Sequence, residues 1–173
     1  MRDSDAIPKG GLPEGLETEF TRESLARDYA KALYDYWTEA RGTAPLPPVS
    51  SLDPTLLPRA CLPFLSVLEV ERNPFRLRSR LAGTAMVEQI GSDPTGHYLD
   101  ELSGMEAQLA RMEWCVREGK PYLTDDRVSF APNKHKRYQV LILPFGDSEQ
   151  GVQRLVGVFC FLEGFDPPKT WSS

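Results

Sequence analysis

The chain has 173 residues, a formal net charge of −5 and a pI of about 5.1. This length fits one domain with extensions, which buries a core without metal or disulfide staples. The acidic balance argues against sequence-independent binding of nucleic acid, and the absence of a long apolar run or a signal peptide predicts a cytoplasmic protein without membrane attachment.

The N-terminal quarter divides into an irregular segment and a helix. Residues 1–20 are rich in Gly, Pro and Glu without periodicity, so we expect a flexible segment. A flanking helix is predicted over residues 21–42, with Thr21 as N-cap and Gly42 as the C-terminal stop. Apolar side chains recur along it at helical spacing: Leu25, Tyr29, Leu33, Tyr36 and Trp37. This stripe must be buried, either on its own domain or as a partner or dimer face, and both can hold.

A proline-rich connector and a short helical turn over residues 43–64 lead into two predicted strands. The first covers residues 65–71. The second covers residues 75–82 and alternates apolar side chains with Arg76, Arg78 and Arg80. If the strands pair antiparallel, the glutamates of the first face these arginines and form cross-strand ion pairs; recognition of an anionic ligand is the alternative.

Short helices are expected after the second strand. Gly83 interrupts the strand, Thr84 is a candidate cap, Gly91 ends the first short helix, and residues 93–96 form a tight turn before a second one. A longer helix is predicted over residues 104–119, and its apolar stripe consists of Met105, Leu109, Met112 and Val116.

Three further strands are predicted at residues 122–130, 137–145 and 154–162, followed by a tail over residues 164–173. The first is polar and typical of an edge strand, whereas the other two are apolar on both faces, so they must be covered on both sides. The element order predicts an α+β fold: a five-stranded antiparallel sheet with helices on one face and the N-terminal flanking helix on the other.

A sequence motif follows the arginine-rich strand. Its residues are Arg80-Leu81-Ala82-Gly83-Thr84, Asp93, Thr95-Gly96, Leu99 and Glu101-Leu102. This pattern resembles the PAS superfamily and, more narrowly, a stand-alone bacterial PAS-like family; Ser79 and His97 depart from it, where that family has an aromatic residue and Arg or Lys. The resemblance implies a PAS-like domain over residues 65–163, a 2-1-5-4-3 strand order and a sensor role in signal transduction.

A ligand pocket is expected between the helices and the sheet, where methionines suit an adaptable lining. The candidate residues are Ser79, Thr84, Met86, Ile90, His97, Tyr98, Leu102, Met105, Leu109, Met112, Tyr122 and Tyr138. An ordinary core is the alternative interpretation. The cofactor stays unknown, because PAS folds bind haem, flavins, acids, lipids or nothing.

The sequence predicts no catalytic site and no metal site. His97 lacks a ligand-spaced His or Cys and an evident orienting acid, so a surface turn is the favoured interpretation. Asp125 and Asp126 are adjacent on a strand and point to opposite faces, which prevents them from acting as a dyad. The three cysteines are expected to be reduced and buried, and none lies in the asparagine–cysteine motif of flavin-adduct photosensors.

Three functional hypotheses follow. The first is a PAS-like sensory or regulatory module that binds a small ligand, a protein partner or both and acts in trans; the expected partner is a second copy of the chain, in a homodimer, or a signalling protein. The second is a ligand-free interaction or dimerisation domain. The third is a small pocket enzyme with His97 as base, but we expect no enzyme.

Overall fold

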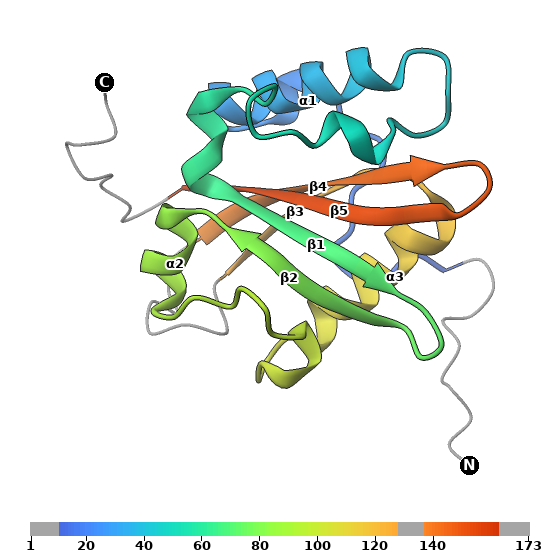
Figure 1. Cartoon of the computed structure of the whole chain (residues 1–173). Coiled ribbons are helices and arrows are strands. Elements are labelled where there is room, and N and C mark those ends of the chain that lie inside the picture. Colours follow the sequence, from blue (N-terminus) through green and yellow to red (C-terminus); the bar gives the residue numbers. More distant parts are fainter. Residues whose placement is uncertain (1–10, 128–136, 163–173) are drawn as a thin grey trace.

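The computed structural model describes residues 11–127 and 137–162, which form a five-stranded antiparallel sheet covered by helices (Figure 1). The strands are β1 (Leu65–Glu71), β2 (Arg76–Ala82), β3 (Tyr122–Arg127), β4 (Arg137–Asp147) and β5 (Gly151–Phe161). Their order is β2-β1-β5-β4-β3. The α+β class and the strand order expected from the sequence are both confirmed.

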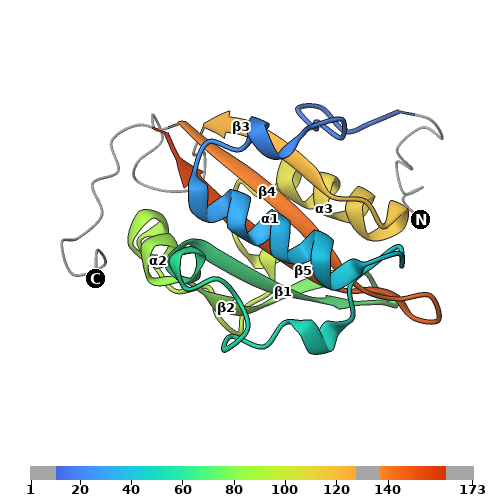
Figure 2. The ribbon, with the colours of Figure 1, turned by 90° about the horizontal axis from the view of Figure 1, so that it is seen from above.

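The helices are distributed over both faces of the sheet. They are η1 (Arg22–Ser24), α1 (Asp28–Arg41), η2 (Val49–Ser51), η3 (Arg59–Phe64), α2 (Thr84–Ile90), η4 (Leu99–Glu101) and α3 (Glu106–Glu118), where η marks 3₁₀ turns. Viewed from above, α1 lies over β4 and β5 (Figure 2). The elements α2, η4 and α3 surround the opposite face (Figure 1).

The flanking helix is shorter than predicted. Thr21 caps the 3₁₀ turn η1, and α1 begins only at Asp28, although Gly42 ends the helix with a φ of 56° as expected. The side-chain amide of Gln139 explains the break. Its Oε1 accepts from the backbone N–H of Ala26 at 2.8 Å, and its Nε2 donates to a carbonyl of η1 at 2.9 Å. These bonds satisfy backbone groups that a continuous helix would have used itself.

The apolar stripe of the flanking helix is buried against the chain's own sheet. Leu25, Leu33 and Trp37 are buried, and the Trp37 indole N–H donates to a backbone carbonyl of β4 at 2.8 Å. Tyr29 and Tyr36 are half-buried, and their hydroxyls donate to carbonyls of β5 and η2. The stripe is therefore buried largely within the chain's own domain, which is one of the two expected interpretations, and its role as a partner or dimer face stays a prediction.

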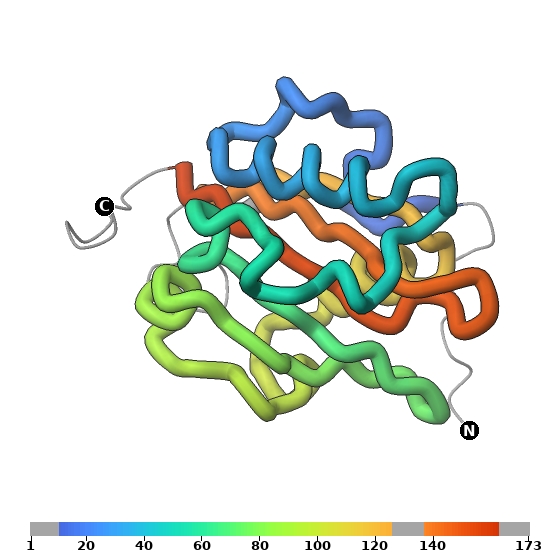
Figure 3. Tube along the Cα trace, turned by 45° about the horizontal axis from the view of Figure 1, so that its top comes forward, coloured from blue at the N-terminus to red at the C-terminus, as the bar shows by residue number. Residues whose placement is uncertain are grey.

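The N-terminal segment is tied to the edge of the sheet. Glu17 exchanges two backbone hydrogen bonds of 2.9 Å with Leu123 of β3, and Arg111 Nε donates to the Glu14 carbonyl at 2.8 Å. Figure 3 shows this segment running beside β3 and α3 before it reaches α1. Residues 11–20 are therefore not the free segment that composition predicted, because the open edge of β3 offers them hydrogen-bond partners. Residues 1–10 lie outside the described residues.

The remaining helix ends and strands differ from prediction in detail. Gly83, not Thr84, is the N-cap of α2, whereas Gly91 and Gly119 end α2 and α3 in the left-handed conformation as expected. The helix expected after the 93–96 turn is only the 3₁₀ turn η4. The last three residues of the predicted strand 122–130, the turn after it and the 164–173 tail lie outside the described residues.

Candidate functional site

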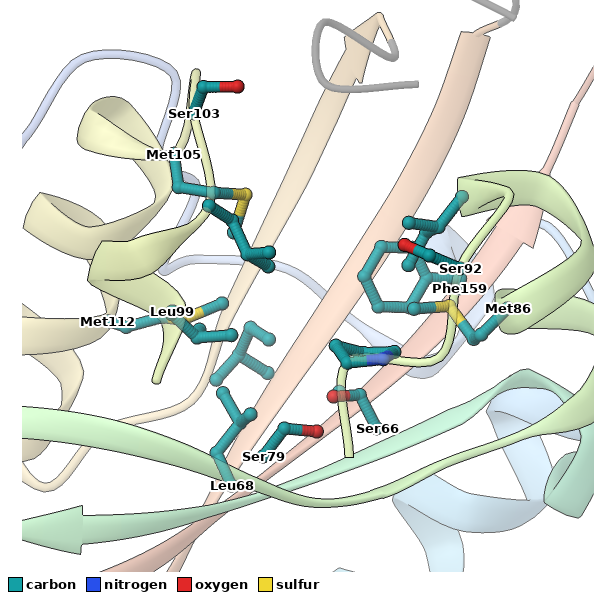
Figure 4. A pocket seen from close by; sticks show the side chains of 15 residues that line it. Ser66, Leu68, Ser79, Met86, Ser92, Leu99, Ser103, Met105, Met112 and Phe159 are labelled. Carbon is teal, nitrogen blue, oxygen red and sulfur yellow. The ribbon is translucent and has the colours of Figure 1, made fainter. Parts of the chain in front are cut away.

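A cavity of about 140 Å³ lies between the sheet and the helices of the α2–α3 face (Figure 4). Figure 4 draws the 15 side chains that line it. They are Ser66, Leu68, Ser79, Met86, Ile90, Ser92, Pro94, Leu99, Leu102, Ser103, Met105, Met112, Ile142, Gly157 and Phe159. All of these lining residues are apolar or carry only a hydroxyl, so the described lining of the cavity is uncharged and mostly apolar.

Small residues on neighbouring strands create the floor of the cavity. Ser66 of β1 lies opposite Gly157 of β5, and Ser79 of β2 lies opposite Leu68. A Cβ on Gly157 would come within 3.1 Å of Ile142 Cδ1, so a larger residue at this position would crowd the neighbouring side chain. Protein interiors are normally close-packed, and three small side chains on one sheet face leave volume that the surrounding helices do not fill.

The walls come from α2, from α3 and from the segment between them. Met86 and Ile90 of α2 form one side, and Met105 and Met112 the other. Ser92 and Ser103 also line the cavity, yet both are exposed. The cavity therefore reaches the surface between the end of α2 and the start of α3, where a small molecule can enter.

Ser79 is the polar group at the floor. Its side chain is buried, with 1 % of the residue exposed, and its Oγ has no hydrogen-bond partner among the described residues. In Figure 4 the hydroxyls of Ser79 and Ser66 lie at the floor of the cavity. A buried hydroxyl without a partner costs about 1–3 kcal/mol, so a bound molecule that supplies a partner gains much of that energy.

The backbone of Ser79 holds the cavity wall in place. Its N–H donates to the His97 carbonyl at 2.9 Å, and its carbonyl accepts from the Gly96 N–H at 2.7 Å. These bonds cover the open edge of β2. The same residue therefore faces the cavity with its side chain and fastens the 96–97 segment with its backbone.

A charged cluster on the outer side strengthens this attachment. Arg76 binds both carboxylate oxygens of Asp100, at 2.8 and 2.6 Å, and its guanidinium lies 3.6 Å from the centre of the Tyr98 ring. The hydrogen bond from Arg76 lowers the pKa of the Asp100 carboxyl. Of the expected cross-strand pairs, Arg80 contacts Glu69 at 3.3 Å, whereas Arg76 uses Asp100 because η4 lies beside the strand edge.

The structure brings part of the predicted pocket together. Of the candidates, those that line the cavity are Ser79, Met86, Ile90, Leu102, Met105 and Met112. Tyr122 and Tyr138 line a second cavity of about 30 Å³, which shares Met105, Met112, Ile142 and Phe159 with the first. Their role in ligand binding stays a prediction.

The other candidates lie outside both cavities. Thr84 is exposed at the start of α2, Leu109 is half-buried in α3 without lining either cavity, and Tyr98 lies on the outer edge of β2. The His97 side chain is 64 % exposed and lies 3.4 Å from Glu101. The 96–98 segment pairs with β2, which turns the side chains of His97 and Tyr98 away from the cavity. A role of these four residues in ligand binding stays a prediction.

Sequence reasoning missed nine of the lining residues, which include small and polar ones as well as apolar ones such as Leu68, Ile142 and Phe159. Ser66 and Gly157 belong to strands that read as ordinary core, and Ser92 and Ser103 read as loop. The glycine within an apolar strand was the available signal, since a glycine there often marks a close approach or a bulge.

Other chemistry is limited in the part of the chain that the structure describes. All three cysteines are buried; burial raises the pKa of Cys61 to about 12 and that of Cys160 to about 11, so these thiols are protonated at neutral pH. Residues 11–127 and 137–162 contain no group of three or more potential metal ligands and no helix long and apolar enough to cross a membrane.

Comparison with known proteins defines the class to which this fold and cavity belong. A family profile for the PAS domain matches residues 26–160, and the chain therefore belongs to the PAS domain family. PAS domains are sensory domains, which is consistent with a signalling module. The comparison with curated proteins gave no match.

The chain is also similar to solved structures of PAS and light–oxygen–voltage domains. A variant of RsLOV is 17 % identical, with 61 % of this chain and 66 % of that chain covered and a TM-score of 0.46. An RNA-binding light–oxygen–voltage receptor is 22 % identical over 67 % of this chain and 36 % of that one, with a TM-score of 0.45. The PAS domain of Bordetella pertussis BvgS is 19 % identical over 58 % and 76 %, with a TM-score of 0.41.

Proposed function

We propose that this chain is a PAS sensory module that binds a small ligand in the cavity between the sheet and α2, η4 and α3, and that it acts on a partner protein in trans. One observation carries the proposal: an accessible cavity of about 140 Å³ with the unpartnered hydroxyl of Ser79 at its floor. The sensory character of the family supports it.

The volume limits the ligand to a small molecule. An apolar cavity of about 150 Å³ in another protein accommodates benzene, whereas sites for drug-sized ligands and cofactors measure about 300–1,000 Å³. The flexible side chains of Met86, Met105 and Met112 can adjust to different shapes. A flavin or a haem would require the walls to move apart.

The ligand signal would leave through Ser79. A molecule that contacts its side chain acts on the residue whose backbone binds residues 96–97. Ligand binding then favours one arrangement of residues 96–97, here called the wall segment, and of the outer Arg76–Asp100 pair. The shift toward that arrangement depends on how much more tightly the ligand binds it. This wall segment is the proposed output surface, recognised by a signalling protein or by a second copy of the chain.

Native mass spectrometry of the freshly purified full chain tests the proposal. We expect a bound small molecule that is released on denaturation and that is lost from Ser79→Leu, in which the larger side chain fills the floor. Thr84→Leu is the matched control, because Thr84 is exposed outside the cavity and its replacement should retain the molecule. Empty wild-type protein that also binds nothing from a metabolite extract would contradict ligand sensing and favour the ligand-free interaction domain.

The enzyme hypothesis has no comparable support. His97 is exposed and its contact is with Glu101 on the surface, outside the cavity. A general base must reach the bound substrate within hydrogen-bond distance, and this histidine does not face the cavity in which a substrate would lie.

A further inference from the structure

We infer that the ligand is an uncharged, mainly apolar molecule of about the size of one substituted ring, with a single hydroxyl or carbonyl group that hydrogen-bonds to Ser79. This inference rests on the proposed function and specifies its ligand. It combines the volume of the cavity, the absence of charge among its described lining residues and the position of the one buried hydroxyl that lacks a partner.

The lining excludes an ionic group. The described side chains around the cavity are aliphatic, thioether, aromatic or hydroxyl groups, together with Pro94 and Gly157. An ion moved from water into such surroundings without a counter-charge carries a large desolvation cost. A carboxylate, a phosphate or an ammonium group would therefore have to remain at the mouth, between Ser92 and Ser103.

Among the described residues, the buried cationic side chain that an anionic ligand could pair with lines the second cavity, not the main one. Arg111 is buried and lines that cavity, and its Nε already donates to the Glu14 carbonyl. The shared side chains of Met105, Met112, Ile142 and Phe159 stand between the two cavities. An acid in the main cavity would thus meet an apolar wall before it met the guanidinium.

Ser79 fixes the orientation of the ligand. A serine hydroxyl can donate one hydrogen bond and accept others, so either a hydroxyl or a carbonyl on the ligand matches it. The polar end of the ligand would point to the sheet floor, where Ser66 lies beside Ser79 in Figure 4, and the apolar body would contact the methionines. A molecule with several polar groups would leave the others buried without partners.

A set of matched one-ring probes tests this ligand class on the full chain at neutral pH. Toluene, benzyl alcohol and benzoate have similar shapes and differ in polarity and charge. Titration followed by ¹H–¹⁵N NMR should show chemical-shift changes at cavity residues. Benzyl alcohol should bind more tightly than toluene, and benzoate should bind at least ten-fold more weakly than benzyl alcohol. A ten-fold difference is about what one buried polar or ionic group without a partner produces.

Variants assign the polar contact. Ser79→Ala should weaken benzyl alcohol about five-fold, within the range of one neutral hydrogen bond, and leave toluene unchanged. Thr84→Ala, outside the cavity, should change neither affinity. If Ser79→Ala does not fold, as judged by circular dichroism, Ser79→Cys keeps the volume with a weaker hydrogen bond and should give the same ranking with a smaller loss.

Three results would overturn the inference, in two different ways. Benzoate binding as tightly as benzyl alcohol, or an equal loss of toluene and benzyl alcohol in Ser79→Ala, would disprove the ligand class and leave ligand sensing intact. No shift at any cavity residue with any probe, while the protein is folded, would disprove both the ligand class and the proposed cavity function.

Discussion

The two faces of the sheet are built from alternate residues of the same strands, yet one is filled and the other is hollow. On the α1 face, Leu33 and Trp37 pack on the sheet with at most 3 % exposed, and the indole N–H is hydrogen-bonded. On the α2–α3 face, Ser66, Ser79 and Gly157 leave a cavity of about 140 Å³. The difference shows that side-chain size at a few inward positions, not overall apolar content, decides which face has room for a ligand.

Strand β5 shows this contrast within consecutive residues. Gly157 and Phe159 line the cavity, and Val156 and Val158 point the opposite way because side chains alternate along a strand. The valines have no measurable exposure and belong to the core. A scaffold packed on one side can therefore tolerate a hollow on the other, and the four predictions below test that division.

The largest effect is expected on the packed face. Trp37→Ala should lower the free energy of unfolding by about 3–5 kcal/mol, because it removes a buried aromatic side chain and leaves a β4 carbonyl without its donor. Urea denaturation measures the loss. Trp37→Phe, which keeps most of the ring, should recover part of it. A loss below 1 kcal/mol for the alanine variant would contradict the packing described for α1.

Matched truncations should separate the two faces. Leu33→Ala should cost about 3–4 kcal/mol, whereas Met112→Ala should cost nearer 2 kcal/mol, since a side chain beside an existing cavity loses fewer contacts. Both residues are buried, so exposure alone does not explain the difference. Equal losses in urea denaturation would mean that the cavity face is as tightly packed as the α1 face.

Filling the floor should stabilise the empty protein. Ser79→Val removes a buried hydroxyl that lacks a partner and adds apolar volume, with an expected gain of about 1 kcal/mol. Thr84→Val, at an exposed position, should stay within about 0.5 kcal/mol of the wild type. A Ser79→Val protein less stable than the wild type would indicate that the hydroxyl has a partner or that the space is already occupied.

The smallest effect concerns the outer attachment of the cavity wall. Because Arg76 lowers the pKa of folded Asp100 below its ordinary value of 3.8, the pair contributes stability above that pH and loses it as the pH falls through the folded pKa. Asp100→Asn should slightly lower the urea midpoint at pH 7, and the difference should vanish under strongly acidic conditions. Glu149→Gln, on the exposed turn before β5, is the control and should show no such trend.

The methionines that line the cavity were predictable from helical spacing, whereas most of the other lining residues were not. Met86, Met105 and Met112 followed from apolar periodicity toward the sheet. Tyr98 lies outside the cavity for which it was a candidate, and His97 lies at the surface as its favoured interpretation predicted, because their segment forms backbone bonds with Ser79. Ser66 gave no sequence signal of its own, since a serine in a strand is also common on a solvent-facing surface.

The sequence alone determined the element order, the glycine ends of α2 and α3, and the burial of the α1 stripe, because periodicity and turn chemistry are local properties. The edge position of β2 followed instead from the resemblance to PAS domains. Only the tertiary structure decided what covers that stripe, where α1 begins and which inward positions leave a hollow. Those outcomes depend on contacts such as Gln139 with Ala26, more than a hundred residues apart, and on the sum of side-chain volumes across β1, β2 and β5. A glycine within an apolar strand, such as Gly157, is a local signal of such a site, but the unfilled volume itself depends on side chains from several segments together.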